Sequence, residues 1–186
     1  INQARKAGNF GWPYFSANNK PYTDYDFAEK KTGEKFNFKK PLNTSVNNTG
    51  LTELPPAQPA FWHYPRASAC AGPVFHSDLF PKDQGGLPAQ LDGCLIAYDW
   101  TTTRIRLIKL DDKGNIEWNE PWLGKYRFVH QGDMALGPKG ELFILEYGSA
   151  WYDGKDGKLK RVTYSKTPQA IAVSPSDPRM KGLPKD

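Results

Sequence analysis

Residues 91–114 read LDGCLIAYDWTTTRIRLIKLDDKG, and this stretch decides the fold class. Two β-prone runs, 93–100 and 104–110, are joined by a turn of three threonines. The second run ends at Asp111 to Gly114, a set of turn-forming residues. The pattern predicts an antiparallel meander, in which each strand pairs with the strand that follows it.

Further short β-prone runs lie on both sides of this meander, separated by turn-forming residues. The run 141–147 repeats the pattern, because it lies between the turns 137–140 and 153–157. In all, we predict strands at 60–64, 72–76, 93–100, 104–110, 115–118, 134–136, 141–147 and 159–164. Many short strands, with 17 glycines and 16 prolines for the turns, predict an all-β sandwich, barrel or propeller. The two similar meanders favour repeated propeller blades.

Composition and charge exclude some classes of function. A chain of 186 residues with 38% hydrophobic residues is large enough to bury a core. The net charge of +5 is spread over short Lys/Arg runs mixed with Asp and Glu, which indicates a solvated surface and argues against a nucleic-acid partner. No apolar run approaches the roughly 20 residues that a membrane-spanning helix needs, so no transmembrane segment is expected.

Two segments lack a strand pattern. Residues 16–58 are polar and without sustained period, which predicts a long irregular loop, and such loops are usually functional or insertions. Residues 166–186 contain four prolines and few apolar residues, which predicts a linker or tail. We therefore expect one folded unit at 1–165, followed by this tail.

The chain has two cysteines, Cys70 and Cys94, without the CxxC or His/Cys spacing of a zinc site. In an oxidising compartment they could form one disulfide, whereas in the cytosol both would be small buried apolar groups. We expect the disulfide.

Several short motifs follow one another along most of the chain. In order they are Gly11-Trp12-Pro13, residues 55–61 (PPAQPAF), Tyr64-Pro65, residues 71–76 (AGPVFH), Asp92-Gly93, Tyr98-Asp99-Trp100 and residues 133–140 (DMALGPKG). In this order they resemble the soluble glucose/sorbosone dehydrogenase family over nearly all of residues 1–165. The resemblance rests on the order and coverage of the motifs, since each one is short.

The resemblance implies a six-bladed β-propeller that binds pyrroloquinoline quinone (PQQ) and calcium and oxidises sugars by hydride transfer to the quinone. Residues 1–165 would supply about three blades, the C-terminal half. The family's general-base histidine and its calcium ligands would lie upstream of Ile1, so we expect no catalytic residue and no metal ligand here. The chain would then be inactive without the missing N-terminal blades. A periplasmic or secreted location, a sugar substrate and an electron acceptor such as a cytochrome follow from the same resemblance.

Four positions match the cofactor side of the family. Lys125 and Arg127 stand where the family has an Arg-Tyr-Arg run that faces the quinone carboxylates, with lysine in place of the first arginine. Phe61 and Tyr64 match the aromatic pair beside quinone and substrate. Without the resemblance, Lys125 and Arg127 read as alternating residues of a solvated strand edge, and Phe61 and Tyr64 as core or channel wall.

The three histidines, His63, His76 and His130, have no sequence neighbour that would orient a general base, so we interpret them as structural. His130 is the best other candidate for a base, because it lies near Gln131 and Asp133. A second function from another class stays open, namely a non-catalytic propeller that binds a glycan or a protein at the cell surface.

Overall fold

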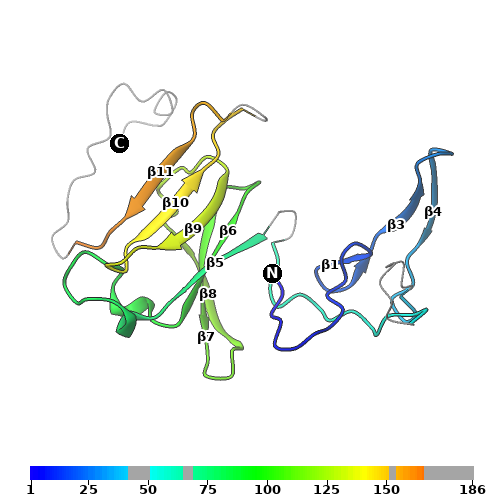
Figure 1. Ribbon diagram of the computed structural model, residues 1–186, viewed down its shortest axis with the longest axis horizontal. Helices are drawn as coiled ribbons and strands as arrows, with labels where there is room; N and C mark the ends of the chain where they lie inside the picture. Colours follow the sequence, from blue (N-terminus) through cyan, green and yellow to red (C-terminus); the bar gives the residue numbers. More distant parts are fainter. Residues whose placement is uncertain (42–50, 65–68, 151–153, 166–186) are drawn as a thin grey trace.

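The computed structural model describes residues 1–41, 51–64, 69–150 and 154–165, and the predicted tail at 166–186 lies outside these ranges. The described part is all-β, as predicted: its strands form antiparallel sheets, and its helical structure is limited to two short 3₁₀ helices. Two sheets make up a body, and two small hairpins form an arm that extends away from it (Figure 1).

The larger sheet is the predicted meander. Its four antiparallel strands lie in sequence order: β5 (Ala69–Phe75), β6 (Cys94–Asp99), β7 (Ile105–Leu110) and β8 (Ile116–Trp122). The connection between β5 and β6 contains both 3₁₀ helices, η1 (Ser77–Leu79) and η2 (Ala89–Leu91). Strand β8 extends four residues beyond the predicted run 115–118, since its residues up to Trp122 pair with β7.

The second sheet follows directly and has three antiparallel strands. They are β9 (Gln131–Leu136), β10 (Leu142–Glu146) and β11 (Lys158–Val162), in the order β11-β10-β9. The predicted runs 134–136, 141–147 and 159–164 correspond to these strands. The first strands of the two sheets, β5 and β9, lie against each other.

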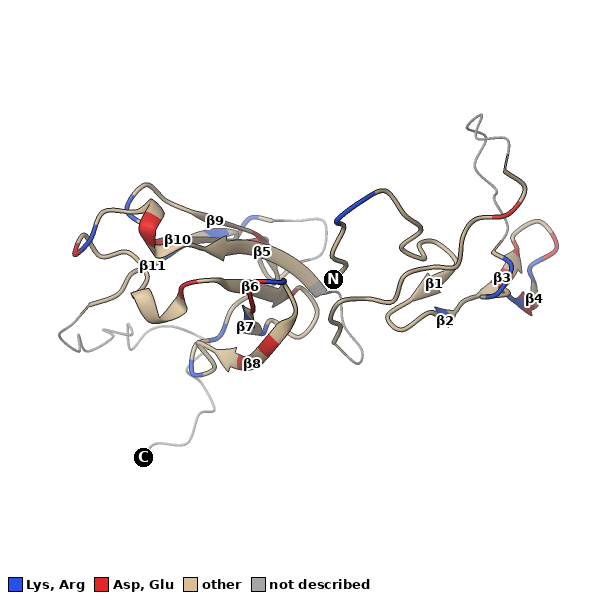
Figure 2. Cartoon of the chain, turned by 90° about the horizontal axis from the view of Figure 1, so that it is seen from below, with Lys and Arg blue, Asp and Glu red and all other residues tan. Residues whose placement is uncertain are grey.

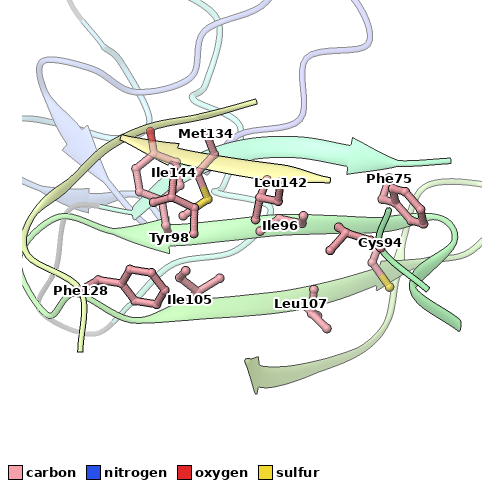
Figure 3. Close-up of a cluster of buried hydrophobic side chains, with 11 residues drawn as sticks. Phe75, Cys94, Ile96, Tyr98, Ile105, Leu107, Phe128, Met134, Leu142 and Ile144 are labelled. Carbon is pink, nitrogen blue, oxygen red and sulfur yellow. The ribbon is translucent and has the colours of Figure 1, made fainter. Parts of the chain in front are cut away.

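A single hydrophobic cluster joins the two sheets. Successive residues of a strand point to opposite faces, so Cys94, Ile96 and Tyr98 of β6 share one face. That face packs against Leu142 and Ile144 of β10, and both of these side chains are fully buried. Figure 3 shows these side chains between the sheets. Burial of this apolar area is what holds the body together.

The opposite face of the β5–β8 sheet is also covered. Leu95, Ala97 and Ile108 form a smaller cluster against Ile1, Phe61 and Trp62. Ile1 and Trp62 are joined by two main-chain hydrogen bonds: the amino group of Ile1 donates at 2.8 Å and the amide of Trp62 at 3.3 Å. The predicted strand at 60–64 is therefore wrong. Its apolar residues lie on the face of a sheet instead of pairing with an edge strand.

The arm replaces much of the predicted irregular loop with short strands. They are β1 (Phe15–Ser16), β2 (Lys20–Pro21), β3 (Thr23–Asp26) and β4 (Lys31–Lys35), which pair as β1-β2 and β3-β4. All residues of β3 and β4 are exposed, which explains why no hydrophobic period marks them. Trp12 and Phe27 are also exposed on this arm, at 80% and 84%.

The expected disulfide between Cys70 and Cys94 is not formed. Cys70 lies opposite Tyr98 on the β5–β6 ladder, whereas Cys94 lies opposite Phe75. Four residues of β6 thus separate the two positions, about 13 Å along a strand. A disulfide needs Cα atoms within about 7 Å, so this register excludes it.

Lys and Arg residues are interspersed with Asp and Glu residues along the body and the arm (Figure 2), in agreement with the sequence prediction of mixed charge. Among the described residues, no helix has the length and apolar character needed to cross a membrane.

Candidate functional site

The loop 123–130 between β8 and β9 contains two of the predicted cofactor-binding residues, Lys125 and Arg127, and both are exposed. A turn begins this loop, closed by a hydrogen bond from the Tyr126 amide to the Leu123 carbonyl oxygen at 2.9 Å. Lys125 therefore lies in a turn and Arg127 just after it, and the alternative reading as alternating residues of a strand edge is wrong. Phe128 anchors the loop, because its buried ring belongs to the cluster between the sheets.

A third cation lies beside this loop. The ammonium group of Lys160, on β11, donates a hydrogen bond to the Tyr126 hydroxyl at 2.7 Å and lies 5.2 Å from the centre of its ring. The same ammonium is 3.7 Å from the carboxylate of Glu146, which is almost fully buried. Loop 123–130 thus has the exposed residues Lys125 and Arg127 on either side of Tyr126 in sequence, and Lys160 contacts the Tyr126 side chain.

Glu146 also fixes the far end of the loop. Its Oε1 accepts a hydrogen bond from the Val129 amide at 2.9 Å. Its Oε2 has no hydrogen-bond partner in the described part of the chain, so the Lys160 ammonium is the charge that faces it. A buried carboxylate held in this way is costly to disturb, because an unpaired charge in the interior is unfavourable.

His130 ends the loop with its ring stacked on Trp100. The ring centres are 5.1 Å apart and the planes meet at 26°. Nδ1 lies 2.8 Å from the Gly148 carbonyl oxygen, which can only accept a hydrogen bond, so Nδ1 carries the proton and Nε2 is the acceptor. The histidine has an orienting partner that the sequence did not reveal, since Gly148 is 18 residues away.

Phe61 and Tyr64 lie on the other side of the β5–β8 sheet. Phe61 packs on the cluster of Leu95, Ala97 and Ile108, opposite the face that holds Phe128. The Tyr64 hydroxyl is buried without a hydrogen-bond partner among the described residues. Desolvation, reinforced by the carboxylate of Asp99, raises the pKa of Tyr64 to about 12. Tyr64 packs on Trp62 of the same cluster, with ring centres 4.3 Å apart, so the structure does not bring Phe61 and Tyr64 together with the loop of Lys125 and Arg127.

A second cluster of functional groups was missed by the sequence analysis. The side chains of His76, Asp78 and Asp92 converge in the connection between β5 and β6, with their ligand atoms within 4.8 Å of one another. The Ser77 amide donates to Asp92 Oδ1 at 2.6 Å and, as the largest cause, holds the pKa of Asp92 below its usual value. The only sequence signal is the short spacing His76-Ser77-Asp78, because Asp92 comes 14 residues later.

Comparison of the chain with protein-family models, with curated protein sequences and with solved structures gives no match.

Proposed function

We propose that this chain is part of a sugar dehydrogenase-like β-propeller whose intact form binds PQQ and oxidises a sugar. The observation that carries the proposal is the arrangement of the body: two consecutive antiparallel meanders pack face to face, with their first strands β5 and β9 in contact. Neighbouring blades of a propeller have this relationship. The choice of this family rests on the ordered motifs of the sequence.

The groups of loop 123–130 fit one part of PQQ. The quinone is flat and carries carboxylates. Lys160 offers positive charge at the Tyr126 ring, and Lys125 and Arg127 are exposed cations next to Tyr126 in sequence. These residues would hold the anionic edge of the cofactor. Phe61 and Tyr64 do not fit the same set, since they lie across the sheet from Phe128.

When bound, the quinone would accept the hydride that leaves the sugar. The role of this chain would be to provide positive charge and to position the cofactor, because the family's general base and calcium ligands match no position within it. A cytochrome or another electron acceptor, a periplasmic or secreted location and the remaining blades belong to the same proposal.

The proposal is tested by titrating PQQ into this chain while following the quenching of tryptophan fluorescence. The variant K125Q/R127Q is expected to bind at least tenfold more weakly, because it removes two of the three cations. K139Q is the matched control, since Lys139 lies exposed in the turn between β9 and β10, away from loop 123–130. Equal affinity of all three proteins would overturn this assignment. With the full-length protein, PQQ and calcium, failure to reduce an artificial dye across a panel of aldoses would reject the enzyme.

A second candidate is a non-catalytic module that binds glycans. It is favoured by the exposed aromatic rings of the arm, where Trp12 lies edge-on to Tyr22 with ring centres 6.3 Å apart. Exposed aromatic groups of this size usually mark a binding surface. Retention of the chain on an immobilised polysaccharide, lost on Trp12→Ala, would favour this candidate over the enzyme.

A further inference from the structure

The cluster of His76, Asp78 and Asp92 lies at the end of β6 remote from loop 123–130. The pair Phe75–Cys94 closes the β5–β6 ladder beside this cluster, and the Gly93 amide donates to the Phe75 carbonyl oxygen at 2.7 Å. Loop 123–130 follows Trp122, which lies opposite Ile105 and thus near the other end of β6. A function of the cluster is therefore independent of the proposed cofactor site.

The backbone of this connection determines where the three side chains lie. His76 is the residue before η1, and this single 3₁₀ turn places Asp78 near it. Asp92 directly follows η2, and its carboxylate is fixed by the Ser77 amide at 2.6 Å. Two segments that are 14 residues apart in sequence are thereby joined at their ends, and the three ligand atoms come within 4.8 Å of one another.

The protein balances the charges of the cluster only in part, since the positive charge of Lys109 acts on Asp92. Asp78 and Asp92 bring two carboxylates close together, and like charges at this separation repel. Lys109 is a nearby cation, but its ammonium donates to the main-chain oxygen of Asp92. Within the described ranges, the side chains of His76 and Asp78 have no hydrogen bond or ion pair, so their ligand atoms are available.

We propose that His76, Asp78 and Asp92 bind a divalent transition-metal ion, with Zn²⁺ as the best fit. Imidazole nitrogen and carboxylate oxygen are both zinc ligands, and zinc can bind three protein ligands and leave a position for water. Zinc–ligand bonds of about 2.0–2.2 Å place tetrahedral ligands roughly 3.4 Å apart, so the ligand atoms must approach by about 1 Å. His76 and Asp78 are exposed and can move by that amount, while Asp92 stays fixed.

The ion would join the two ends of the connection 76–93, which otherwise crosses the surface with few buried side chains. A ligand that binds only the folded form stabilises it in proportion to its concentration over its dissociation constant. We therefore assign the metal a structural function in the β5–β6 connection, separate from any chemistry at loop 123–130.

The test is calorimetric titration of ZnCl₂ into the chain after treatment with a chelator, together with thermal unfolding. The expected result is one Zn²⁺ per chain and a higher melting temperature, with Ca²⁺ and Mg²⁺ giving neither effect at the same concentration. Asp78→Asn and His76→Asn should each weaken binding at least tenfold. Both residues are exposed, so the variants should keep the circular dichroism spectrum of the wild type.

Two control variants locate the site. Asp112→Asn removes an exposed carboxylate of a different turn, and His63→Asn removes an exposed histidine, and both should bind Zn²⁺ like the wild type. Failure to bind Zn²⁺, or binding that survives D78N and H76N, would overturn the assignment. PQQ titrations of the same variants should be unchanged, which separates this inference from the proposed function.

Discussion

The carboxylate of Glu146 lies 3.7 Å from the ammonium of Lys160, with Glu146 almost fully buried and Lys160 partly exposed. Lys160 lies opposite Ile144 on the β10–β11 ladder, so it reaches Glu146 diagonally across the two strands. The pair holds loop 123–130 at two points, because Lys160 donates a hydrogen bond to the Tyr126 hydroxyl and Glu146 accepts one from the Val129 amide. The exposed cations Lys125 and Arg127 thus belong to a loop that is held by Lys160 and Glu146.

Lys160→Met is expected to lower the free energy of unfolding by about 1–3 kcal/mol, since it leaves the Glu146 carboxylate buried without its cation. Urea unfolding measures the change. Arg161→Met, an exposed neighbour on β11, is the control and should stay within about 0.5 kcal/mol of wild type. The double variant E146Q/K160M should recover part of the loss, because it removes both charges. A K160M protein as stable as R161M would show that the ion pair contributes nothing.

Adjacent residues of β10 provide a second test, because they point to opposite faces of the sheet. Ile144 is fully buried between the sheets, whereas Leu145 is 50% exposed. Ile144→Ala should cost about 2–5 kcal/mol of stability through lost burial and the cavity left behind. Leu145→Ala should cost less than about 1 kcal/mol. Urea unfolding of both variants decides the point, and equal losses would contradict the packing of the two sheets.

The strands of the body were predictable because their residues alternate or form wholly apolar runs. The run 94–99 is buried on both faces, so its apolar composition alone was enough to predict a buried strand. The segment 60–64 has the same β-prone composition, but it covers a sheet and pairs with no edge strand. Local composition indicates burial, but it does not distinguish a strand that pairs in a sheet from a segment that covers the face of one. The strands β3 and β4 were missed for the opposite reason, since they have no buried face.

The candidate sites depended on contacts that are distant in sequence. The contact of Lys160 with the loop follows from strand register, since Lys160 lies 34 positions after Tyr126. The convergence of Asp92 with His76 depends on the path of a long connection. Neither a spacing rule nor composition contains such information.

The two cysteines provide a third prediction. Because Cys70 and Cys94 are opposite Tyr98 and Phe75, a reducing agent should leave the melting temperature unchanged. Thiol titration in denaturant without reductant should give two free thiols per chain. One disulfide per chain, or a melting temperature that falls on addition of dithiothreitol, would show that the β5–β6 register is different from the one described.

Because of Tyr98, the stability of the body should depend on pH in the alkaline range. Its ring is buried in the cluster between the sheets, and its hydroxyl donates to the Gly132 carbonyl oxygen at 3.0 Å. Burial, followed by the neighbouring Cys70, raises the pKa of Tyr98 to about 12, whereas a tyrosine of the unfolded chain ionises near 10. Between these values the unfolded chain releases a proton that the folded chain keeps.

The contribution of Tyr98 to the free energy of unfolding should therefore be constant below about pH 10 and fall as the pH rises towards 12. Urea unfolding between pH 8 and pH 11.5 measures this slope. Tyr98→Phe should be less stable than the wild type at neutral pH, because it loses the hydrogen bond to Gly132. Its free energy of unfolding should fall less steeply with rising pH, because it lacks the ionisable group. A smaller slope should remain, because the buried Tyr64 also has a raised pKa. Tyr22→Phe, at an exposed position of the arm, should keep the wild-type slope. Identical slopes for Y98F and Y22F would show that Tyr98 does not titrate as a buried phenol.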